Sequence, residues 1–323
     1  MIVVTGAAGF IGSCLVAKLN ELGHTNLILV DHYDNDEDPK KKNLEGKKYL
    51  RYFDKAEYLK LLRRDTFDYD VECIFHMGAC SSTTVQDADY FEKNNYEYSV
   101  IVAQWALKYN ARLIYASSAA TYGDGEIGYS DDESLIPQLK PLNLYGLSKQ
   151  KFDLWVLNNQ HQTKMAGLKF FNVFGPNEFH KEDMRSVVAK AYDGVVSEGK
   201  MRLFKSYKPE YKDGEQKRDF VYVKDVVDVM IFLMNNPSVN GIFNVGTGQA
   251  CTWVELAKAL FKAAGKQPQI EFIAMPDILQ SRYQYFTQAD MGKLRAAGYT
   301  KPFTSLEAAV ADYCQYLKNK TYL

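Results

Sequence analysis

The sequence lacks an excess of charge of either sign, since 39 Lys and Arg residues stand against 40 Asp and Glu residues. A formal net charge of -1 gives no electrostatic reason to expect nucleic acid or an anionic membrane as a partner. It also lacks any apolar run of about 18 residues, the length that suggests a membrane span. The chain opens on a predicted strand without a signal-like segment. We therefore expect a soluble cytoplasmic protein that binds neither nucleic acid nor membrane.

Cysteine is scarce and dispersed. None of the five cysteines lies in a CxxC pair or near a histidine at metal-ligand spacing; they are Cys14, Cys73, Cys80, Cys251 and Cys314. An odd, scattered set predicts reduced thiols and excludes a disulfide framework or a zinc site. We expect no bound metal, and we expect Cys80 to pack near the cofactor without acting as a nucleophile.

Internal repeats and low-complexity segments are also missing, and what remains is an alternation of short apolar runs with helical patterns. The predicted strands are Met1–Thr5, Leu27–Val30, Cys73–His76, Leu113–Ala116 and Gly167–Phe171. This alternation predicts an α/β fold with a doubly wound parallel sheet of the Rossmann type.

The alternation breaks down after Phe171. We expect residues 1–171 with 218–251 to form the dinucleotide-binding domain, and residues 172–217 with 252–323 to form a smaller, discontinuous substrate-binding lobe. Asp219–Val223 and Ile242–Val245 are expected to return to the main sheet, and the polar stretches 34–48 and 205–218 to be loops. The substrate should lie between the lobes, beyond the carboxyl ends of the strands.

Glycines at positions 6, 9 and 12 separate the first predicted strand from the helix that begins at Phe10. Gly6 permits the tight turn, Gly9 lets the backbone approach a pyrophosphate, and Gly12 lets the helix pack on the sheet. Unpaired N–H groups at the helix start would bind the phosphate charge. The pattern predicts dinucleotide binding.

Asp31 ends the second predicted strand, where a carboxylate accepts hydrogen bonds from the adenosine ribose and favours NAD. Lys40, Lys41 and Lys42 follow in the next loop and could neutralise a 2′-phosphate. These residues alone leave NAD and NADP equally supported.

Tyr145 and Lys149 lie four residues apart at the start of a predicted helix, on one face. A lysine cation and an oxidised nicotinamide would lower the pKa of the phenol, which is ~10 when unperturbed. Upstream, the strand Leu113–Ala116 leads into paired serines, so Ser118 can bond the reacting oxygen opposite Tyr145. The glycine turn, the serine at the end of a strand and the Tyr/Lys pair on a helix together predict a nicotinamide-dependent enzyme.

At these residues the chain resembles the extended short-chain dehydrogenase/reductases. Further stretches make it similar, over nearly its whole length, to the ADP-L-glycero-D-manno-heptose 6-epimerases of lipopolysaccharide core biosynthesis: Ile74–Thr84, Tyr115–Gly123, Asn172–Lys181, Arg218–Val223, Arg282–Asp290 and Leu294–Phe303. The resemblance implies an ADP-heptose substrate, a tightly bound NADP and a homo-oligomer, with a pentamer suggested. Lys40 matches the 2′-phosphate lysine of this family, which favours NADP over NAD.

The resemblance also implies site residues. Tyr145 and Lys181 match two catalytic acid/base groups, supported by Lys149 and Ser118. With the glycines of the turn, the expected cofactor contacts are Gly6, Gly9, Phe10, Ile11, Gly12, Asp31, His32, Lys40, Lys55, Met77, Gly78, Ala79, Cys80, Ser81, Asn94, Lys149, Val173 and Lys181. The expected substrate contacts are Ser118, Asn172, Asp183, Lys190, Phe204, Lys205, Ser206, Tyr207, Arg218 and Tyr283.

Some positions depart from that family. Asp183 stands where a serine is common, Lys190 where a histidine is common, and Met77 where a glutamate is usual. The stretches 31–43 and 205–217 are longer than the family norm. These departures concern substrate contacts and part of the cofactor loop, and they leave the catalytic set intact.

The implied chemistry is removal of the C6 hydroxyl proton with hydride transfer, rotation of the 6-keto sugar, and return of the hydride to its other face. Two faces need two proton-transfer groups, Tyr145 and Lys181, while His180 is expected to position the loop. A 4-epimerase or a dehydratase is the alternative, although Ala119-Ala120 stand where a dehydratase would carry Asp-Glu. A non-enzymatic nucleotide sensor would typically have lost the Tyr or the Lys.

Overall fold

The computed structural model describes residues 1–83, 85–280 and 283–323. Thr84 and Arg282, which end and begin two of the stretches quoted above, lie outside the described residues. A seven-stranded sheet forms the centre, in the order β10-β6-β5-β4-β1-β2-β3. Its strands are β1 (Ile2–Thr5), β2 (Leu27–Asp31), β3 (Arg51–Asp54), β4 (Cys73–His76), β5 (Arg112–Ser118), β6 (Met165–Phe170) and β10 (Gly241–Val245). All neighbouring pairs are parallel, which confirms the doubly wound α/β prediction.

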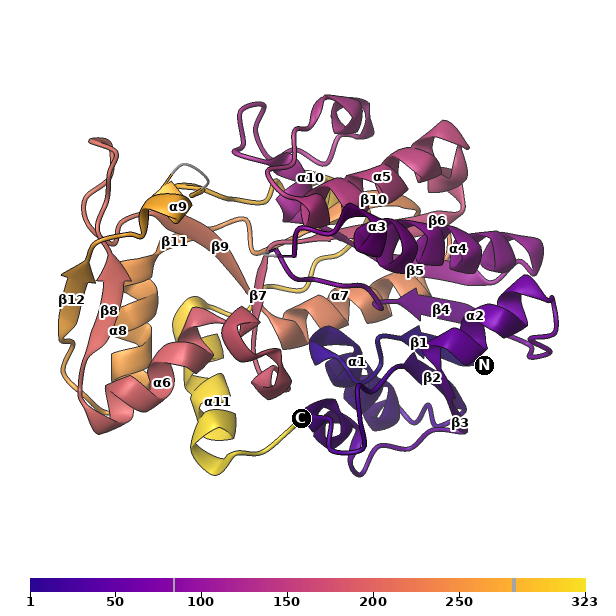
Figure 1. The fold of residues 1–323 in the computed structure, drawn as a ribbon, viewed down its shortest axis with the longest axis horizontal. Coiled ribbons are helices and arrows are strands. Elements are labelled where there is room, and N and C mark those ends of the chain that lie inside the picture. Colours follow the sequence, from indigo (N-terminus) through magenta and orange to yellow (C-terminus); the bar gives the residue numbers. More distant parts are fainter. Residues whose placement is uncertain (84, 281–282) are drawn as a thin grey trace.

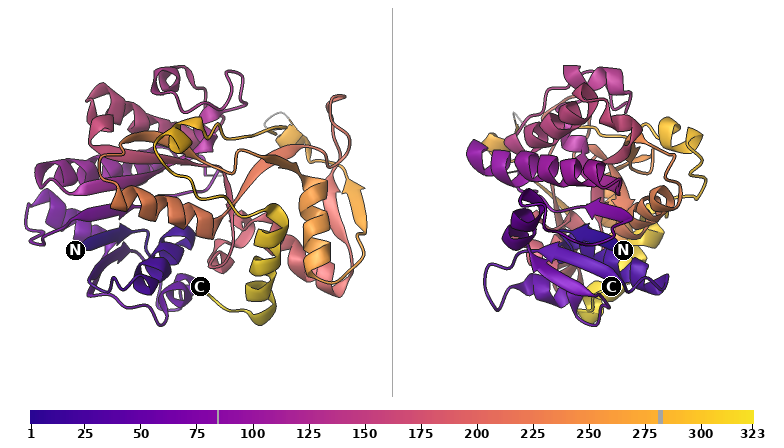
Figure 2. Two further views of the ribbon diagram at one scale, coloured as in Figure 1. Left: turned by 180° about the vertical axis from the view of Figure 1, so that it is seen from behind. Right: turned by 90° about the vertical axis from the view of Figure 1, so that its right-hand side faces the viewer.

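Helices cover both faces of this sheet because its strands are apolar on both sides. Val4 packs into a cluster with α1 (Phe10–Glu21) and α7 (Val223–Asn235). The adjacent Val3 packs into a second cluster with α2 (Lys55–Arg63), α4 (Tyr98–Lys108) and α5 (Leu144–Asn158). Figure 1 shows these helices around the labelled strands, and the views of Figure 2 show the same layering.

A second group of elements lies to one side of the seven-stranded sheet, at the left of Figure 1. It comes from segments far apart in the sequence. Its strands are β7 (Asn172–Phe174), β8 (Met201–Phe204), β9 (Lys217–Tyr222), β11 (Ala250–Thr252) and β12 (Ile270–Ile273), and its larger helices are α6 (Val187–Ser197), α8 (Trp253–Ala263) and α11 (Leu306–Asn319). The shortest α-helices are α3 (Ala88–Phe91), α9 (Asp277–Gln280) and α10 (Gly292–Ala296).

One strand prediction is wrong. Ile242–Val245 does join the main sheet, as β10 beside β6, but Asp219–Val223 does not. Instead β9 pairs with β7 and β11 in a separate three-stranded sheet. The buried carboxylate of Asp219 explains the difference, because it needs donors that the apolar sheet cannot offer and receives them from the backbone of Thr247, Gly248 and Ala289.

Two smaller features also differ from expectation. Strand β3 was not predicted, since only Phe53 of its four residues is buried and the pattern is too short to read. The stretch 34–48, expected as a loop, contains a 3₁₀ helix at Pro39–Leu44. Among the described residues, no helix combines the length and apolar character needed to cross a membrane.

Candidate active site

The glycine turn between β1 and α1 forms a cradle with no room for side chains. Gly6 has a φ of +65°, and a Cβ there would lie 2.7 Å from the backbone nitrogen of Gly78. A Cβ on Gly12 would lie 2.1 Å from the carbonyl oxygen of Gly6. Gly9 precedes the first helical residue, and no described side chain caps α1. The first-turn N–H groups of Phe10 and Ile11 are therefore left for an anion, so this cradle fits a dinucleotide pyrophosphate.

Asp31 lies beside this cradle at the carboxyl end of β2. Its Oδ2 accepts from the backbone nitrogen of Ala8 and its Oδ1 from that of His32, both at 2.8 Å. Lys40 Nζ lies 3.5 Å from Asp31 Oδ1 and donates to the carbonyl of His32 at 2.5 Å. Lys41 instead pairs with the exposed Asp36. The structure thus puts a fixed carboxylate and one cation together beside the cradle, where the sequence predicts the adenosine ribose to bind.

Asn43, which the sequence did not single out as a site residue, ties the cofactor loop to the loop after β7. Its fully buried Nδ2 donates to the carbonyls of Ala8 and Asn177 at 2.8 and 3.2 Å. It also lies 3.1 Å from His180 Nδ1, which must then accept. Burial and two nearby lysines lower the pKa of His180 to about 4, so the ring is neutral at neutral pH. This geometry favours the positioning role expected for His180.

The loop after β4, which contains the predicted cofactor contacts Met77–Ser81, is held from two sides. Gly78 donates its N–H to Thr5 Oγ1 at 3.1 Å. Asn95 accepts from the N–H of Cys80 at 2.8 Å, donates to its carbonyl at 2.9 Å, and also donates to Ser148 Oγ at 2.9 Å. Asn95 lies in a π-helical turn, Glu92–Glu97, a distortion that is frequent at functional sites. Asn95 was not predicted as a site residue, although its neighbour Asn94 was.

Lys55 and Asn94, both predicted cofactor contacts, meet in the structure. Lys55 Nζ donates to Asn94 Oδ1 at 2.6 Å and lies 4.8 Å from the centre of the Tyr98 ring. Burial lowers the pKa of Lys55, with nearby Asp31 opposing the shift. The pair therefore offers a polar wall next to the loop after β4.

Ser118, Tyr145 and Lys149 come together where β5 ends and α5 begins. The Ser118 and Tyr145 hydroxyls are hydrogen-bonded, and Lys149 Nζ donates to the carbonyl of Ala116 at 2.9 Å. Burial lowers the pKa of Lys149 to about 8. Burial also raises the pKa of Tyr145, while the hydrogen bond with Ser118 lowers it. The lowering expected from Lys149 together with an oxidised nicotinamide stays a prediction. The ammonium is directed to a carbonyl, not to the phenol.

Lys181 lies on the 3₁₀ helix Phe179–Met184, next to the glycine cradle. Its Nζ is 5.1 Å from the centre of the Phe10 ring, and burial lowers its pKa, opposed by the carboxylate of Glu178. The next residue, Glu182, has a φ of 46°, which is strained for a residue with a side chain. The structure thus joins Lys181 to Phe10, and among the described residues it records no contact between Lys181 and Tyr145.

Arg218 forms a cationic centre in the second group of elements. Its guanidinium donates to the carbonyls of Lys217, at 2.8 Å, and of Gln284. It lies 5.1 Å from the ring centre of Tyr283, which in turn is 6.4 Å from that of Phe204. No carboxylate of the described residues pairs with this buried arginine. Its charge is thus available to a phosphate, in line with the predicted role.

The other predicted substrate contacts are more exposed. Lys190 Nζ donates to the carbonyl of Asp183 at 3.2 Å, so the two family departures touch each other at the surface. Ser206 is held by Asp213 through its backbone nitrogen, at 2.8 Å, while Tyr207 is 50% exposed. Asn172 and Lys205, also predicted substrate contacts, are exposed, and Val173, a predicted cofactor contact, is half-buried.

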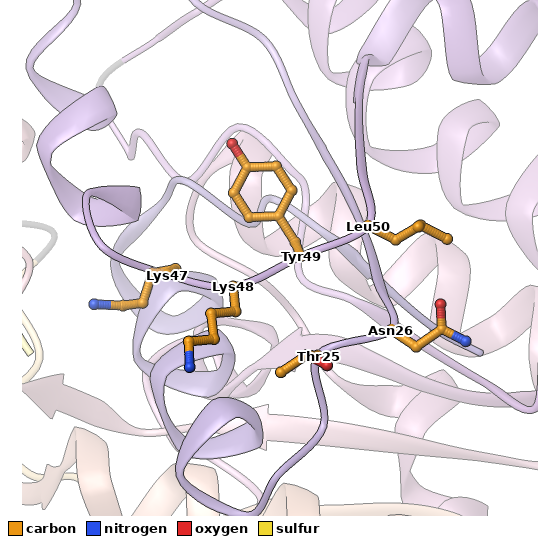
Figure 3. A pocket seen from close by; sticks show the side chains of 6 residues that line it. All are labelled: Thr25, Asn26, Lys47, Lys48, Tyr49 and Leu50. Atoms are coloured by element: carbon orange, nitrogen blue, oxygen red, sulfur yellow. The ribbon is translucent and has the colours of Figure 1, made fainter.

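The structure also contains two surface hollows, one of them on the far side of the sheet from these residues. The hollow in Figure 3, of about 520 Å³, is lined by Thr25, Asn26 and residues 47–50. It lies at the amino ends of β2 and β3, the edge of the sheet opposite the glycine cradle, where ligands of this fold do not bind. A hollow of about 640 Å³ lies between residues 127–130, 247–249, 286 and 288–291, past the carboxyl end of β10. In the part of the chain that the structure describes, no cluster of His, Cys, Asp or Glu is arranged to hold a metal.

Comparisons with known proteins agree with this arrangement. The model of the NAD dependent epimerase/dehydratase family matches residues 2–246. The ADP-L-glycero-D-manno-heptose-6-epimerase of Nitratidesulfovibrio vulgaris is 51% identical over 313 residues, 97% of this chain and 96% of that protein. The enzyme of the same name from Fusobacterium nucleatum is 47% identical over 335 residues and covers 100% of both chains.

A solved structure supports the same grouping. The crystal structure of Helicobacter pylori ADP-L-glycero-D-manno-heptose-6-epimerase superposes with a TM-score of 0.83 at 30% sequence identity, covering 98% of this chain and 96% of that one. The matches extend over both the seven-stranded sheet and the second group of elements. The chain therefore belongs to the NAD-dependent epimerase/dehydratase family and, within it, to the ADP-L-glycero-D-manno-heptose-6-epimerases.

Proposed function

We propose that this protein is an NADP-dependent epimerase that inverts C6 of an ADP-activated glycero-manno-heptose, for lipopolysaccharide core biosynthesis. The observation that carries the proposal is the meeting of Ser118, Tyr145 and Lys149 at the sheet edge that also bears the glycine cradle. The 51% identity to a heptose 6-epimerase, over nearly the whole of both chains, supports this substrate over other nucleotide sugars.

NADP is the proposed cofactor because Lys40 stands beside Asp31. A carboxylate alone would repel a 2′-phosphate, while a neighbouring ammonium neutralises that repulsion and donates to the phosphate oxygens. The residues that would hold the dinucleotide are those of the glycine cradle, the Asp31–Lys40 pair, Lys55 with Asn94, and the loop after β4. Lys149, Val173 and Lys181 complete the proposed cofactor contacts. When bound, NADP would supply the hydride acceptor for oxidation of the sugar and the hydride donor for its reduction.

The substrate would span from Tyr145 to Arg218. Arg218 is suited to the diphosphate, since its planar guanidinium is charged, buried and unpaired with any described carboxylate. Tyr283 and Phe204 would supply aromatic walls for the adenosine moiety. We propose residues 172–217 with 252–323 as the substrate-binding lobe and residues 1–171 with 218–251 as the cofactor-binding domain. Strand β9, which carries Arg218 and pairs with β7 of the lobe, lies at the boundary between the two.

Tyr145 would take the C6 hydroxyl proton, and the hydrogen bond from Ser118 would hold the reacting oxygen. Because burial raises the pKa of Tyr145, its deprotonation needs positive charge nearby, which the Lys149 ammonium and the oxidised nicotinamide would supply together. Lys181, whose pKa is lowered by burial, would donate the proton on the opposite face after the 6-keto sugar has turned. Two proton-transfer groups on different elements suit a reaction that uses both faces.

The proposal extends to the assembly and the compartment. The five free cysteines, three of them buried, are the state expected of a cytoplasmic protein. We also propose that the protein forms a homo-oligomer, with a pentamer suggested by the family. Sedimentation analysis of the purified protein tests this assembly.

The decisive experiment incubates the purified protein with ADP-D-glycero-D-manno-heptose and follows C6 by NMR. We expect conversion toward an equilibrium of the two C6 epimers without net oxidation. Inversion at C4, or loss of water to a deoxy sugar, would instead make the protein a 4-epimerase or a dehydratase. An unchanged sugar in the presence of NADP would contradict the proposal.

A further inference from the structure

A buried ion pair lies behind the site and has no role in the chemistry proposed so far. Lys169 on β6 and Asp153 on α5 are both 0% exposed, with Nζ and Oδ2 2.7 Å apart. Asp153 also accepts from the hydroxyls of Ser117, at 2.7 Å, and Tyr115, at 3.1 Å. Lys169 also donates to Thr121 Oγ1 at 2.8 Å. The Asp153 carboxylate therefore accepts three hydrogen bonds within the core, and the Lys169 ammonium donates two.

Stability alone is a weak reason to keep such a pair. Desolvating two charges costs several kcal/mol per ion, and well-packed apolar replacements of buried pairs are often neutral or stabilising. The position of this pair is more informative. Asp153 is one helical turn after Lys149 on α5, on the same face, and its partner Ser117 lies between Ala116 and Ser118. The pair thus touches both segments that carry the Ser/Tyr/Lys group.

We propose that Asp153 and Lys169 are positioning residues. The Asp153 carboxylate keeps the Lys149 ammonium charged, and Lys169 holds the end of the strand that carries Ser118. This inference rests on the function proposed above, because the charge of Lys149 has a purpose only if Lys149 serves Tyr145 and the cofactor in that reaction. Asp153 and Lys169 touch no reacting atom and act through their neighbours.

The electrostatics around Lys149 support this role. Burial is the largest influence and lowers the pKa of Lys149 to about 8, while Asp153 is the main group that raises it and Cys80 is a weaker one. His76 on β4 faces the same lysine, but burial lowers its pKa to about 3, so it is neutral. Tyr145 is neutral too, because burial raises its pKa. Without the Asp153 carboxylate, Lys149 would lose its proton at a lower pH.

Further charged groups surround the pair itself. Tyr115 and Tyr122 have pKa values raised well above the ordinary value by burial, so both stay neutral. Asp131, Glu133 and Asp290 are the other carboxylates whose charge reaches these tyrosines, and none of them contacts Lys149 in the described part of the chain. Lys169 is therefore the one cation in contact with Asp153 among the described residues.

The test uses a paired variant that removes both charges while retaining similar volume, Asp153→Asn with Lys169→Met. The first readout is the pH dependence of NADP binding to the cofactor-stripped protein, and the second is that of epimerisation. We expect the alkaline midpoint of both curves to fall by about one pH unit, since removing an opposite charge typically shifts a pKa by one unit or more. Lys169→Met alone keeps the carboxylate, so its midpoint should not fall.

Control variants separate the effect of the lost charges from damage to the fold. Glu133→Gln with Lys293→Met removes a second, half-exposed ion pair whose members do not contact Lys149, and it should leave the midpoint unchanged. Should the paired variant not fold, Asp153→Asn alone removes the charge and retains an acceptor for Ser117 and Tyr115. An unchanged midpoint in the folded Asn variant, or an equal fall in Lys169→Met, would overturn the inference. A shifted binding curve in a protein that does not epimerise would refute only the proposed function.

Discussion

Replacing Lys40 with methionine is the most direct test of how the cofactor is chosen. In the structure Lys40 Nζ is 3.5 Å from Asp31 Oδ1 and 3.7 Å from Asp38 Oδ2, and its side chain is only 15% exposed. A 2′-phosphate bound at the ribose would enter between a fixed carboxylate and this ammonium. NAD has no such phosphate, so the substitution should discriminate between the two nucleotides.

The size of the effect follows from the contacts that are lost. A hydrogen bond to a charged group contributes about 1.5–3 kcal/mol, and each 1.4 kcal/mol changes affinity about tenfold. Loss of one Lys40–phosphate contact should therefore raise the dissociation constant for NADP by about 10- to 150-fold. The unopposed charge of Asp31 adds repulsion in the same direction. Affinity for NAD should change by less than about threefold, because the contact of Lys40 with Asp31 is a partly screened ion pair.

The assay measures dissociation constants for NADP and NAD on protein stripped of its cofactor, at two salt concentrations. Lys41→Met is the matched control, because Lys41 sits in the same 3₁₀ helix but pairs with the exposed Asp36 at 3.5 Å. It should leave both constants nearly unchanged. An equal loss for NAD and NADP in the Lys40 variant would refute the reasoning, and so would purified parent protein that carries only NAD.

Three further predictions concern single residues. Tyr145→Phe should lower turnover by about 100-fold or more with little change in cofactor binding, because removal of a proton-transfer group typically costs 10²–10⁴-fold; near-normal epimerisation would remove the tyrosine from its role. Lys181→Met should block inversion from both heptose epimers, yet it should affect dismutation of a C6-aldehyde analogue to a different extent than Tyr145→Phe does. If Lys181→Met epimerises normally, His180→Asn becomes the next variant to assay. Gly12→Ala should lose NADP from the purified protein, since its Cβ would lie 2.1 Å from the Gly6 carbonyl oxygen; retained NADP would contradict the tight cradle.

The sequence predicted the parts of the fold that depend on local pattern. Strands buried on both faces read as continuous apolar runs, and Cys73–His76 was predicted with the bounds that β4 has. Strand β3 was not predicted because one buried residue in four gives no periodic signal. The sheet that β9 joins could not be predicted, since Asp219 finds its donors in segments that are distant in the sequence.

The same distinction holds within the site. Gly6, Tyr145 and Lys149 were predictable because a motif of short range carries each of them. Asn95 and Asn43 were not, because their importance lies in bonds to residues 15 to 137 positions away. A buried asparagine has no signature of its own in one sequence, and only the three-dimensional partners show which loops it joins.

The two ends of the site differ in how firmly they are held, and this difference suits the proposed reaction. At the end proposed to bind the cofactor, Asp31 and Asn43 are each fixed by several hydrogen bonds, and Gly6 leaves no space for movement. At the substrate end, Arg218 is held by backbone carbonyls and the aromatic face of Tyr283, contacts that tolerate small shifts. The carbon proposed to change lies outside the sugar ring, so rotation about one bond could present its other face while the diphosphate stays bound. A rigid nicotinamide pocket and an anchored but adaptable sugar pocket would together let one hydride leave and return on opposite faces.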